Sequence, residues 1–267
     1  MKFLKITFFA GILFLLAMSY TLLSSTIVRK DFKKYYDKYG VDGSFVMYDQ
    51  KNDRYTVYNQ DQRSKPFTPA STFKICNSLI SLETGVVKDE NVIFKWDGQD
   101  RAMKAWNQDT DMRTAFRNST VWYYQELARR IGEDRMKKWL TKADYGNADI
   151  TGSIDAFWLS GNLRITPDQQ IDFLRRIHDN KLPFSKRSMD IVKDIMIVND
   201  TLGKVTRAKP GAGKQGKHYV GWYVGYVTTK DNVYYFSNCI QSFEKREDFG
   251  KARFEILNDI LTDLKVY

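Results

Sequence analysis

Strand-type sequences lie near both ends of this chain, with helix-type sequences between them. Each end carries two runs rich in Val, Tyr, Phe and Ile, separated by polar turn-forming residues. The runs are 44–49 and 54–59 near the N-terminus, and 219–227 and 233–240 near the C-terminus. If these two hairpins share one sheet, the residues between them must pack separately, as an insertion beside that sheet. The sequence therefore predicts an α+β fold: a central antiparallel sheet from both chain ends, flanked by helices, with an inserted, mostly helical lobe at about 90–200.

The central part of the chain repeats apolar residues at the helical spacing of 3.6. The predicted helices are 71–84, 123–142, 167–180 and 185–197, and a last helix begins at about Asp248 with Phe254, Leu257 and Leu261 on one stripe. Thr166-Pro167 has the residue types favoured at the N-cap and first position of a helix. We therefore expect one unit of two packed lobes, over 26–267, with a cleft between them.

The first 25 residues have the pattern of an export signal. Lys2 and Lys5 precede an apolar run that begins at Ile6, and small residues at Ala17 and Ser19 suit a cleavage enzyme. Counted through to Leu23, the run reaches 18 residues, enough to cross a bilayer. A cleaved signal peptide and a retained membrane anchor both fit, and in either case the remainder is predicted to be exported, to a periplasmic or extracellular location.

The formal net charge of +10 is spread along the chain and is not gathered in an aromatic-rich basic stretch. We therefore predict a solvated basic surface and no nucleic-acid partner. Cys76 and Cys239 lie in a helix pattern and a strand pattern, which favours buried free thiols over a bridge. With two histidines and neither C-x-x-C nor H-E-x-x-H, the sequence predicts no metal site.

Ser71 and Lys74 stand three residues apart in the largely apolar stretch Pro69-Ala-Ser-Thr-Phe-Lys-Ile75. At the start of a helix this spacing puts both side chains on one face, with Cβ atoms about 5 to 6 Å apart. Backbone N–H groups at that end favour an oxyanion. A buried lysine loses its charge readily, so it can act as a base toward the serine or be modified by carbon dioxide. The competing interpretation is a helix-capping serine beside a surface-reaching lysine.

A second Ser-x-x-Lys, Ser242 to Lys245, sits in a charged segment after a strand and is interpreted as a solvated loop.

Further motifs follow Ser71 in a fixed order along the chain. They are Ser119-Thr120-Val121, Tyr145-Gly146-Asn147, Asp155-Ala-Phe-Trp-Leu159, Lys209-Pro210-Gly211 and Gly221-Trp-Tyr-Val-Gly225. In this ordered set the sequence resembles the class D β-lactamases, the oxacillinase family of serine enzymes related to penicillin-binding proteins. The resemblance covers nearly all of the exported part and includes Phe94-Lys-Trp-Asp-Gly98, Ala105-Trp106-Asn107 and Arg253-Phe-Glu-Ile256. It implies a β-lactamase/transpeptidase-like fold.

The resemblance implies that Ser71 is the acylated nucleophile and that Lys74 is an N-carboxylated general base. No cofactor is implied apart from the carbon dioxide held on Lys74. The apolar pocket for that lysine would be formed by Phe73, Val121, Trp158 and Leu159. Trp158 would donate its indole N–H to the carbamate, since that group is a donor only.

The remaining roles follow from the same resemblance. Ser119 would relay a proton to the leaving nitrogen with help from Lys209, and the backbone N–H groups of Ser71 and Ala212 would form the oxyanion hole. Arg253 would hold the substrate carboxylate with its planar fork. Substrate contacts are also expected from Gly211, Val121 and Trp106, while Tyr145, Gly146 and Asn147 would be a structural turn.

One position departs from the family pattern. Pro210 replaces the usual threonine or serine between Lys209 and Gly211, so neither a hydroxyl nor a backbone N–H is offered there. Lys38 and Lys214 also begin Lys-x-Gly sequences, but a strand pattern leads into Lys209, which we therefore prefer. The departure raises the question of how fast an acylated enzyme turns over.

The sequence thus predicts an exported serine enzyme that hydrolyses β-lactam antibiotics through an acyl-enzyme. A penicillin-binding or β-lactam-sensing protein that stays acylated is the alternative; a basic binding module would have to treat the ordered motifs as accidental. The preferred β-lactams and the oligomeric state are not predicted.

Overall fold

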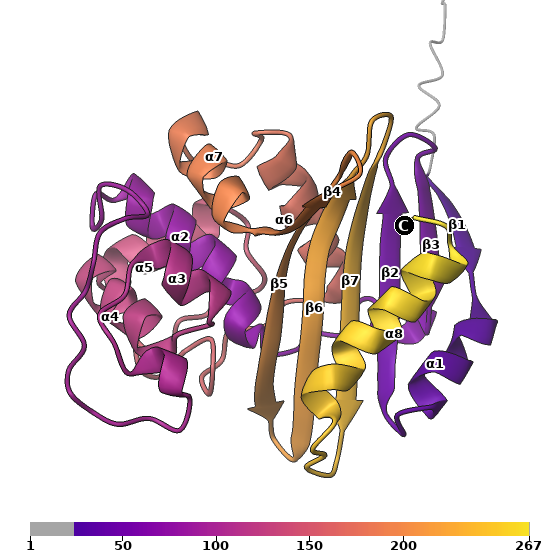
Figure 1. Cartoon of the computed structure of the whole chain (residues 1–267), viewed down its shortest axis with the longest axis horizontal. Helices are drawn as coiled ribbons and strands as arrows, with labels where there is room; N and C mark the ends of the chain where they lie inside the picture. Colours follow the sequence, from indigo (N-terminus) through magenta and orange to yellow (C-terminus); the bar gives the residue numbers. More distant parts are fainter. Residues whose placement is uncertain (1–23, 267) are drawn as a thin grey trace, which may run out of the picture.

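The fold is built on one seven-stranded sheet, seen in a computed structural model that describes residues 24–266 (Figure 1). The strand order is β1-β3-β2-β7-β6-β5-β4. The strands are β1 Ser25–Val28, β2 Asp42–Asp49, β3 Arg54–Tyr58, β4 Ile197–Thr201, β5 Lys204–Gln215, β6 His218–Thr228 and β7 Val233–Ser242. Apart from Ser24 and Ser25, the predicted leader lies outside the described residues.

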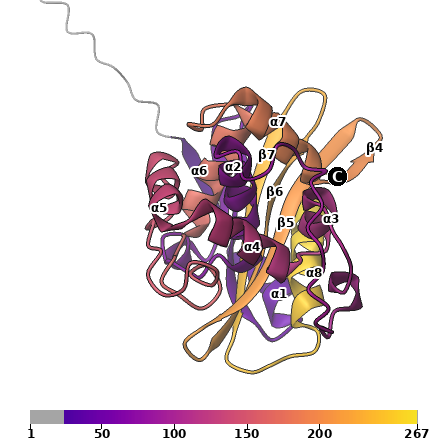
Figure 2. The same ribbon diagram turned by 90° about the vertical axis from the view of Figure 1, so that its left-hand side faces the viewer.

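Helices cover both faces of this sheet and extend beyond one edge of it. They are α1 Lys33–Asp37, α2 Lys74–Glu83, α3 Met112–Arg117, α4 Val121–Ile131, α5 Glu133–Lys142, α6 Pro167–His178, α7 Lys186–Ile195 and α8 Phe249–Asp263. Four short 3-10 helices are η1 Lys30–Phe32, η2 Gln60–Gln62, η3 Ala70–Phe73 and η4 Lys104–Trp106. Helices α1 and α8 pack on one face and α6 on the other, while α2 to α5 form the helical lobe beside β5 (Figures 1 and 2).

The two predicted hairpins are present, and they join in the middle of the sheet. Strand β2 pairs antiparallel with β7 from Asp42↔Gln241 to Asp49↔Tyr234. Because these strands come from opposite ends of the sequence, the sheet is built from both termini, as the strand patterns predicted. The α+β prediction is confirmed.

Alternation along the strands divides the core into two clusters, one on each face of the sheet. In β2, Val46 and Tyr48 belong to the cluster under the helical lobe, whereas Phe45 and Met47 face α8. Cys76 and Cys239 are both buried free thiols, as expected.

Three features differ from the sequence expectations or were absent from them. The predicted helix at 123–142 is two helices, because Gly132 adopts φ +77° between α4 and α5. Helix α2, which corresponds to the predicted helix at 71–84, packs against α4 and α7 and so lies with the helical lobe, although its residues precede the expected lobe at about 90–200. Strands β1 and β4 are short and largely exposed, so neither has the half-buried alternation that indicates a strand.

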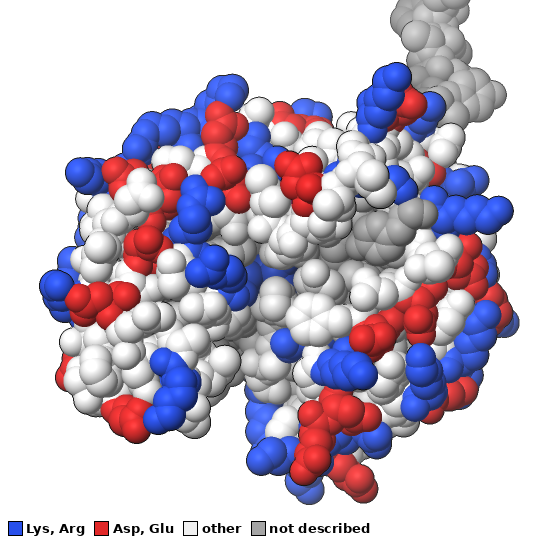
Figure 3. Space-filling model, in the orientation of Figure 1, with Lys and Arg blue, Asp and Glu red and all other residues white. Residues whose placement is uncertain are grey.

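Basic and acidic side chains are interspersed over the face shown in Figure 3, and the surface is hollowed between the helical lobe and the sheet. Within residues 24–266, no helix has the length and apolar character needed to cross a membrane.

Candidate active site

Ser71 lies in η3, the turn that leads into α2 at the edge of the helical lobe. The residue before it, Ala70, has φ +47°, a conformation rare for a residue with a side chain. Its N–H donates to the Trp158 carbonyl over 3.1 Å, which holds the turn in place. The strained turn leaves Ser71 with 9% exposure, while the next three residues are almost completely buried.

Lys74 is completely buried, and its Nζ lies 2.8 Å from Ser71 Oγ. This confirms that the two side chains share one helical face. Burial lowers the pKa of Lys74 to about 7. Within the described part of the chain, no carboxylate forms an ion pair with Lys74, and the centroid of the Tyr124 ring lies 5.2 Å from its Nζ. The Lys74 side chain is therefore largely a neutral amine above pH 7.

An aromatic cluster is built around Phe73, the residue before this lysine. The Phe73 ring packs against Tyr145, Phe157 and Trp158, with centroids 5.1 to 5.6 Å apart. Trp158 is fully buried, yet its Nε1 has no hydrogen-bond partner. Val121 and Leu159, the other two predicted pocket residues, are partly buried. A buried indole N–H without an acceptor costs free energy, so Trp158 supplies a donor that nothing in residues 24–266 uses.

Ser119 and Lys209 meet across the two lobes. Ser119 precedes α4 with φ +52°, and its Oγ accepts a hydrogen bond from Lys209 Nζ. Lys209 lies on β5, is 1% exposed and also contacts the Phe116 ring, 5.0 Å from its centroid. Burial first, and the nearby charges of Lys74 and Arg253 second, hold the pKa of Lys209 well below its usual range.

The other two Lys-x-Gly sequences lie elsewhere. Lys38 pairs with Asp259 beside α8, and Lys214 lies over the Tyr219 ring.

Strand β5 runs close beside the nucleophile turn. A Cβ on Gly211 would lie 3.0 Å from the Pro69 carbonyl oxygen, and one on Gly213 would lie 3.2 Å from Ala70 Cβ. Ala212, between these glycines, is exposed and pairs with Gly221 on β6. Small residues here let the strand approach η3, which places Ala212 next to the turn that carries Ser71.

Arg253 reaches from α8 to this same stretch of β5. Its Nη1 donates to the Gly211 carbonyl over 2.7 Å, while its Nε is buried without a partner. Burial lowers the pKa of Arg253 to about 10. Among residues 24–266 it has no ion pair with a carboxylate, so its positive charge lacks an acidic partner.

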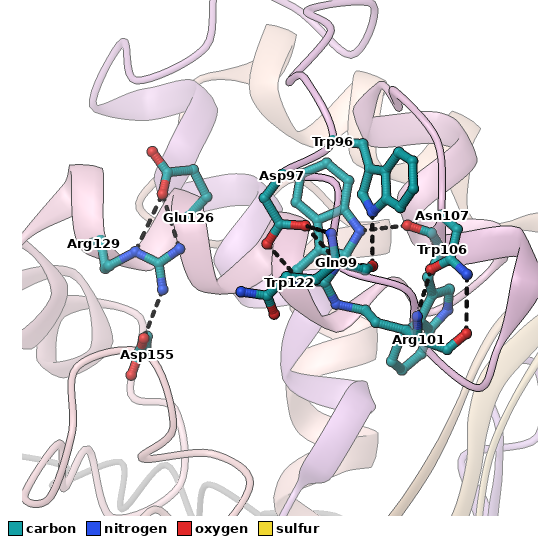
Figure 4. Close-up of polar contacts among 10 residues, drawn as sticks. All are labelled: Trp96, Asp97, Gln99, Arg101, Trp106, Asn107, Trp122, Glu126, Arg129 and Asp155. Atoms are coloured by element: carbon teal, nitrogen blue, oxygen red, sulfur yellow. Dashed lines mark hydrogen bonds and ion pairs between the residues drawn. The ribbon is translucent and has the colours of Figure 1, made fainter.

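Trp106 lies on the loop that borders α4. Its Nε1 donates to the Asn118 carbonyl over 2.9 Å, and Trp122 Nε1 donates to the Trp106 carbonyl over 2.8 Å. Arg101, farther back on the loop, pairs with Asp97, and its N–H donates to Asn107 Oδ1 (Figure 4). These contacts fix the Trp106 ring beside the residues that precede α4.

Tyr145, Gly146 and Asn147 form a turn in which Tyr145 is buried and Asn147 is exposed. Tyr145 packs on Phe73, and a Cβ on Gly146 would lie 2.1 Å from the Arg164 carbonyl oxygen. Asn147 Oδ1 accepts from the Arg164 N–H over 2.9 Å. All three residues therefore contact the supporting structure around the pocket.

The sequence reasoning missed two supporting residues, Tyr124 and Gln170. Gln170 Nε2 donates to Thr72 Oγ1 over 2.9 Å, and Thr72 Oγ1 donates to the Pro69 carbonyl over 2.8 Å. Gln170 is 1% exposed and lies on the apolar face of α6 with Ile171 and Leu174. A polar residue on the otherwise apolar face of a predicted helix is the sequence feature that could have indicated a supporting role for Gln170.

Three basic side chains with lowered pKa values thus lie close to Ser71: Lys74, Lys209 and Arg253. None of the three forms an ion pair with a carboxylate among residues 24–266. Such a site suits an anionic ligand and nucleophilic attack by Ser71. No cluster of three metal-binding side chains occurs in the part of the chain that the structure describes.

Comparison with known proteins agrees with this geometry. Residues 43–262 match the family described as "Penicillin binding protein transpeptidase domain". The chain is 44% identical to "Beta-lactamase OXA-48" of Klebsiella pneumoniae over 209 residues, which are 78% of this chain and 79% of that protein.

A solved structure and a regulatory protein are also similar. The class D β-lactamase YbXI from Nostoc superposes with a TM-score of 0.84 at 44% identity, covering 89% of this chain and 99% of that one. "Regulatory protein BlaR1" of Bacillus licheniformis is 35% identical over 92% of this chain, which spans 41% of that longer protein. The fold, the ordered motifs and these similarities together show that the chain belongs to the class D β-lactamases, within the penicillin-binding protein transpeptidase family.

Proposed function

We propose that this protein hydrolyses β-lactam antibiotics through an acyl-enzyme on Ser71. The observation that carries the proposal is the 2.8 Å contact between Ser71 Oγ and the buried, largely neutral amine of Lys74. A hydroxyl becomes a useful nucleophile at neutral pH when a base lies within hydrogen-bond reach.

The residues around Lys74 fit N-carboxylation of this lysine. Carbon dioxide adds to a neutral amine with loss of one proton, and the lowered pKa keeps the amine neutral. The unpartnered Nε1 of Trp158 would donate to the resulting anion, and Phe73 and Phe157 would keep water away. When bound, the carboxyl group supplies an anionic base beside Ser71.

In the proposed reaction Ser71 Oγ bonds to the lactam carbonyl carbon, and its proton would pass to the side chain of Lys74, which lies 2.8 Å away. The N–H groups of Ser71 and Ala212 would stabilise the oxyanion. The carbon–nitrogen bond then breaks, and the leaving nitrogen takes a proton through Ser119 and Lys209, whose side chains are in contact. Water next cleaves the ester, which releases the opened product and restores Ser71.

Substrate would be held by its carboxylate. We assign this role to Arg253, because Pro210 offers no hydroxyl and the Arg253 guanidinium is held beside β5 by its hydrogen bond to the Gly211 carbonyl. Val121, Gly211 and Trp106 would line the remaining contact surface of a small-molecule substrate.

The test is to mix the purified exported part with a chromogenic cephalosporin and a penicillin, with and without bicarbonate. We expect steady turnover that bicarbonate increases, and an intact mass that shows a transient adduct on Ser71. Ser71→Ala should abolish the adduct, and Lys74→Ala should abolish turnover. Hydrolysis retained in either variant would refute the assignment.

A second function, a β-lactam sensor or penicillin-binding protein that stays acylated, is favoured by one observation. Pro210 removes a hydroxyl that could contact the substrate carboxylate, and losing a hydrogen bond to a charged group costs about 1.5 to 3 kcal/mol. A stable adduct on Ser71 without turnover would support this second function. On the basis of residues 1–25 we also propose that the protein acts after export, in the periplasm or outside the cell.

A further inference from the structure

Gln170 is a polar side chain on a helix face that is otherwise apolar. Helix α6 packs against β2, β6 and β7, and Gln170 is 1% exposed on the buried stripe that also contains Phe173 and Leu174. Burial of an amide among apolar side chains is unfavourable unless the amide is hydrogen-bonded. Gln170 Nε2 meets this requirement at Thr72 Oγ1, on the turn that carries Ser71.

We propose that Gln170 is a positioning residue for the acylation step. By fixing the Thr72 hydroxyl, it holds the nucleophile turn in the conformation that lets the N–H groups of Ser71 and Ala212 donate to the same lactam carbonyl oxygen. The inference rests on the proposed function and adds to it a residue of α6 that acts through Thr72.

Thr72 closes the nucleophile turn with two hydrogen bonds to one carbonyl. Its N–H donates to the Pro69 carbonyl over 3.1 Å, and its Oγ1 donates to the same oxygen over 2.8 Å. Ala70, with φ +47°, and Ser71 lie between these two ends. A hydroxyl has a single hydrogen to donate, and here it is used at Pro69, so the Gln170 amide must present its N–H to Thr72 Oγ1. The two bonds together fix the rotation of the Thr72 side chain.

Strand β5 packs against both ends of this turn. A Cβ on Gly211 would lie 3.0 Å from the Pro69 carbonyl oxygen, 3.1 Å from Thr72 Cγ2 and 3.2 Å from the Thr72 nitrogen. Ala212 follows Gly211, and its N–H is the second donor of the proposed oxyanion hole. Thr72 therefore contacts both α6 and β5, so release of its side chain changes the packing of the turn against the strand that carries Ala212.

The consequence belongs to the transition state of acylation. The lactam carbonyl oxygen gains negative charge as Ser71 adds to the carbonyl carbon, so misplaced donors cost more in the transition state than in the initial complex. A misplaced turn lowers the acylation rate constant of every site, whereas a partly unfolded protein has fewer reactive sites.

The test is single-turnover acylation of the full exported chain by a slowly deacylated penicillin, with the reactive sites titrated in each preparation. Gln170→Met keeps the length of the side chain but removes the N–H donor, so the acylation rate constant per reactive site should fall about tenfold. The dissociation constant of the initial complex should change by less than about twofold. The infrared stretching frequency of the acyl-enzyme ester carbonyl should rise, because weaker hydrogen bonds from the oxyanion hole leave the C=O bond stronger.

Gln169→Met is the matched control. Gln169 precedes Gln170 on α6, and its Oε1 accepts from the Thr166 N–H over 3.0 Å in the capping box. Loss of this cap should lower the melting temperature. The acylation rate constant per reactive site and the carbonyl frequency should stay at their wild-type values.

Two backgrounds at Thr72 show whether the effect passes through its hydroxyl. In Thr72→Ser, which keeps the hydroxyl, Gln170→Met should again slow acylation about tenfold. In Thr72→Val, which removes it, adding Gln170→Met should change the rate constant by less than about twofold, because no hydrogen bond between the two side chains is left to lose.

Three results would overturn the positioning role and leave the proposed function intact. They are an unchanged acylation rate constant in Gln170→Met, an equal fall in Gln169→Met, and an undiminished effect of Gln170→Met in the Thr72→Val background. Absence of acylation in the wild-type protein would overturn both.

Discussion

Replacing Lys74 by methionine should stabilise the fold near neutral pH, and the gain should shrink as the pH rises. Burial lowers the pKa of Lys74 from 10.5 to about 7. Between these values the unfolded chain binds more protons than the folded chain, so the free energy of unfolding increases with pH. One full proton corresponds to about 1.36 kcal/mol per pH unit. Since the buried amine is half protonated at pH 7, the lysine should add about 2 kcal/mol of stability between pH 7 and pH 9.

The measurement is urea unfolding of the wild type and Lys74→Met at pH 7 and pH 9, in buffers free of bicarbonate so that the amine stays unmodified. The charge of Lys74 also lowers the pKa of Lys209, so the same comparison is repeated in a Lys209→Met background, where Lys209 cannot titrate. We expect the stability advantage of Lys74→Met to fall by about 2 kcal/mol from pH 7 to pH 9. An advantage that is independent of pH would show that the Lys74 ammonium is not desolvated, and the argument for a neutral amine beside Ser71 would fail.

Other substitutions test the remaining parts of the site. Trp158→Phe removes the unpartnered N–H but keeps a ring, so the bicarbonate concentration that gives half-maximal turnover should rise about tenfold; an unchanged requirement would refute the proposed donor role. Arg253→Gln should raise the KM for a penicillin about 10- to 100-fold with little change in kcat, and an unaltered KM would place the carboxylate elsewhere. Pro210→Thr should lower that KM, and no change would show that the position does not contact substrate. Gly146→Ala should destabilise the fold by at least about 1 kcal/mol more than Gly98→Ala in thermal unfolding, because both glycines have positive φ but nothing lies within 4 Å of a Cβ on Gly98; equal losses would contradict the packing explanation.

Much of the fold was predictable because its larger elements carry strong periodic patterns. Strands β2, β6 and β7 are rich in Val, Tyr, Phe and Ile and are buried along most of their length, and α6 has a capping box at Thr166 and Gln169. Strands β1 and β4 could not be predicted, since four and five largely exposed residues leave no apolar face to detect. Strand β1 is also parallel to β3, and no local turn specifies that pairing.

The candidate site was predictable in its residue types and less so in its supports. The spacing of Ser71 and Lys74 on one helical face requires only helix geometry, and the structure has it. The left-handed φ of Ala70 has no sequence signal, because alanine rarely adopts it. The contact of Gln170 with Thr72 joins residues 98 positions apart and depends on how α6 packs on the sheet.

The order of the sheet determines how the protein can be attached to a surface. Strand β1, where the described chain begins, lies at one edge, and four strands separate it from β5. At about 4.8 Å per strand, this places Ser25 roughly 24 Å from the strand that carries Lys209. A linker to a bead, an electrode or a display scaffold joined ahead of Ser25 would therefore leave the opening above Ser71 unobstructed.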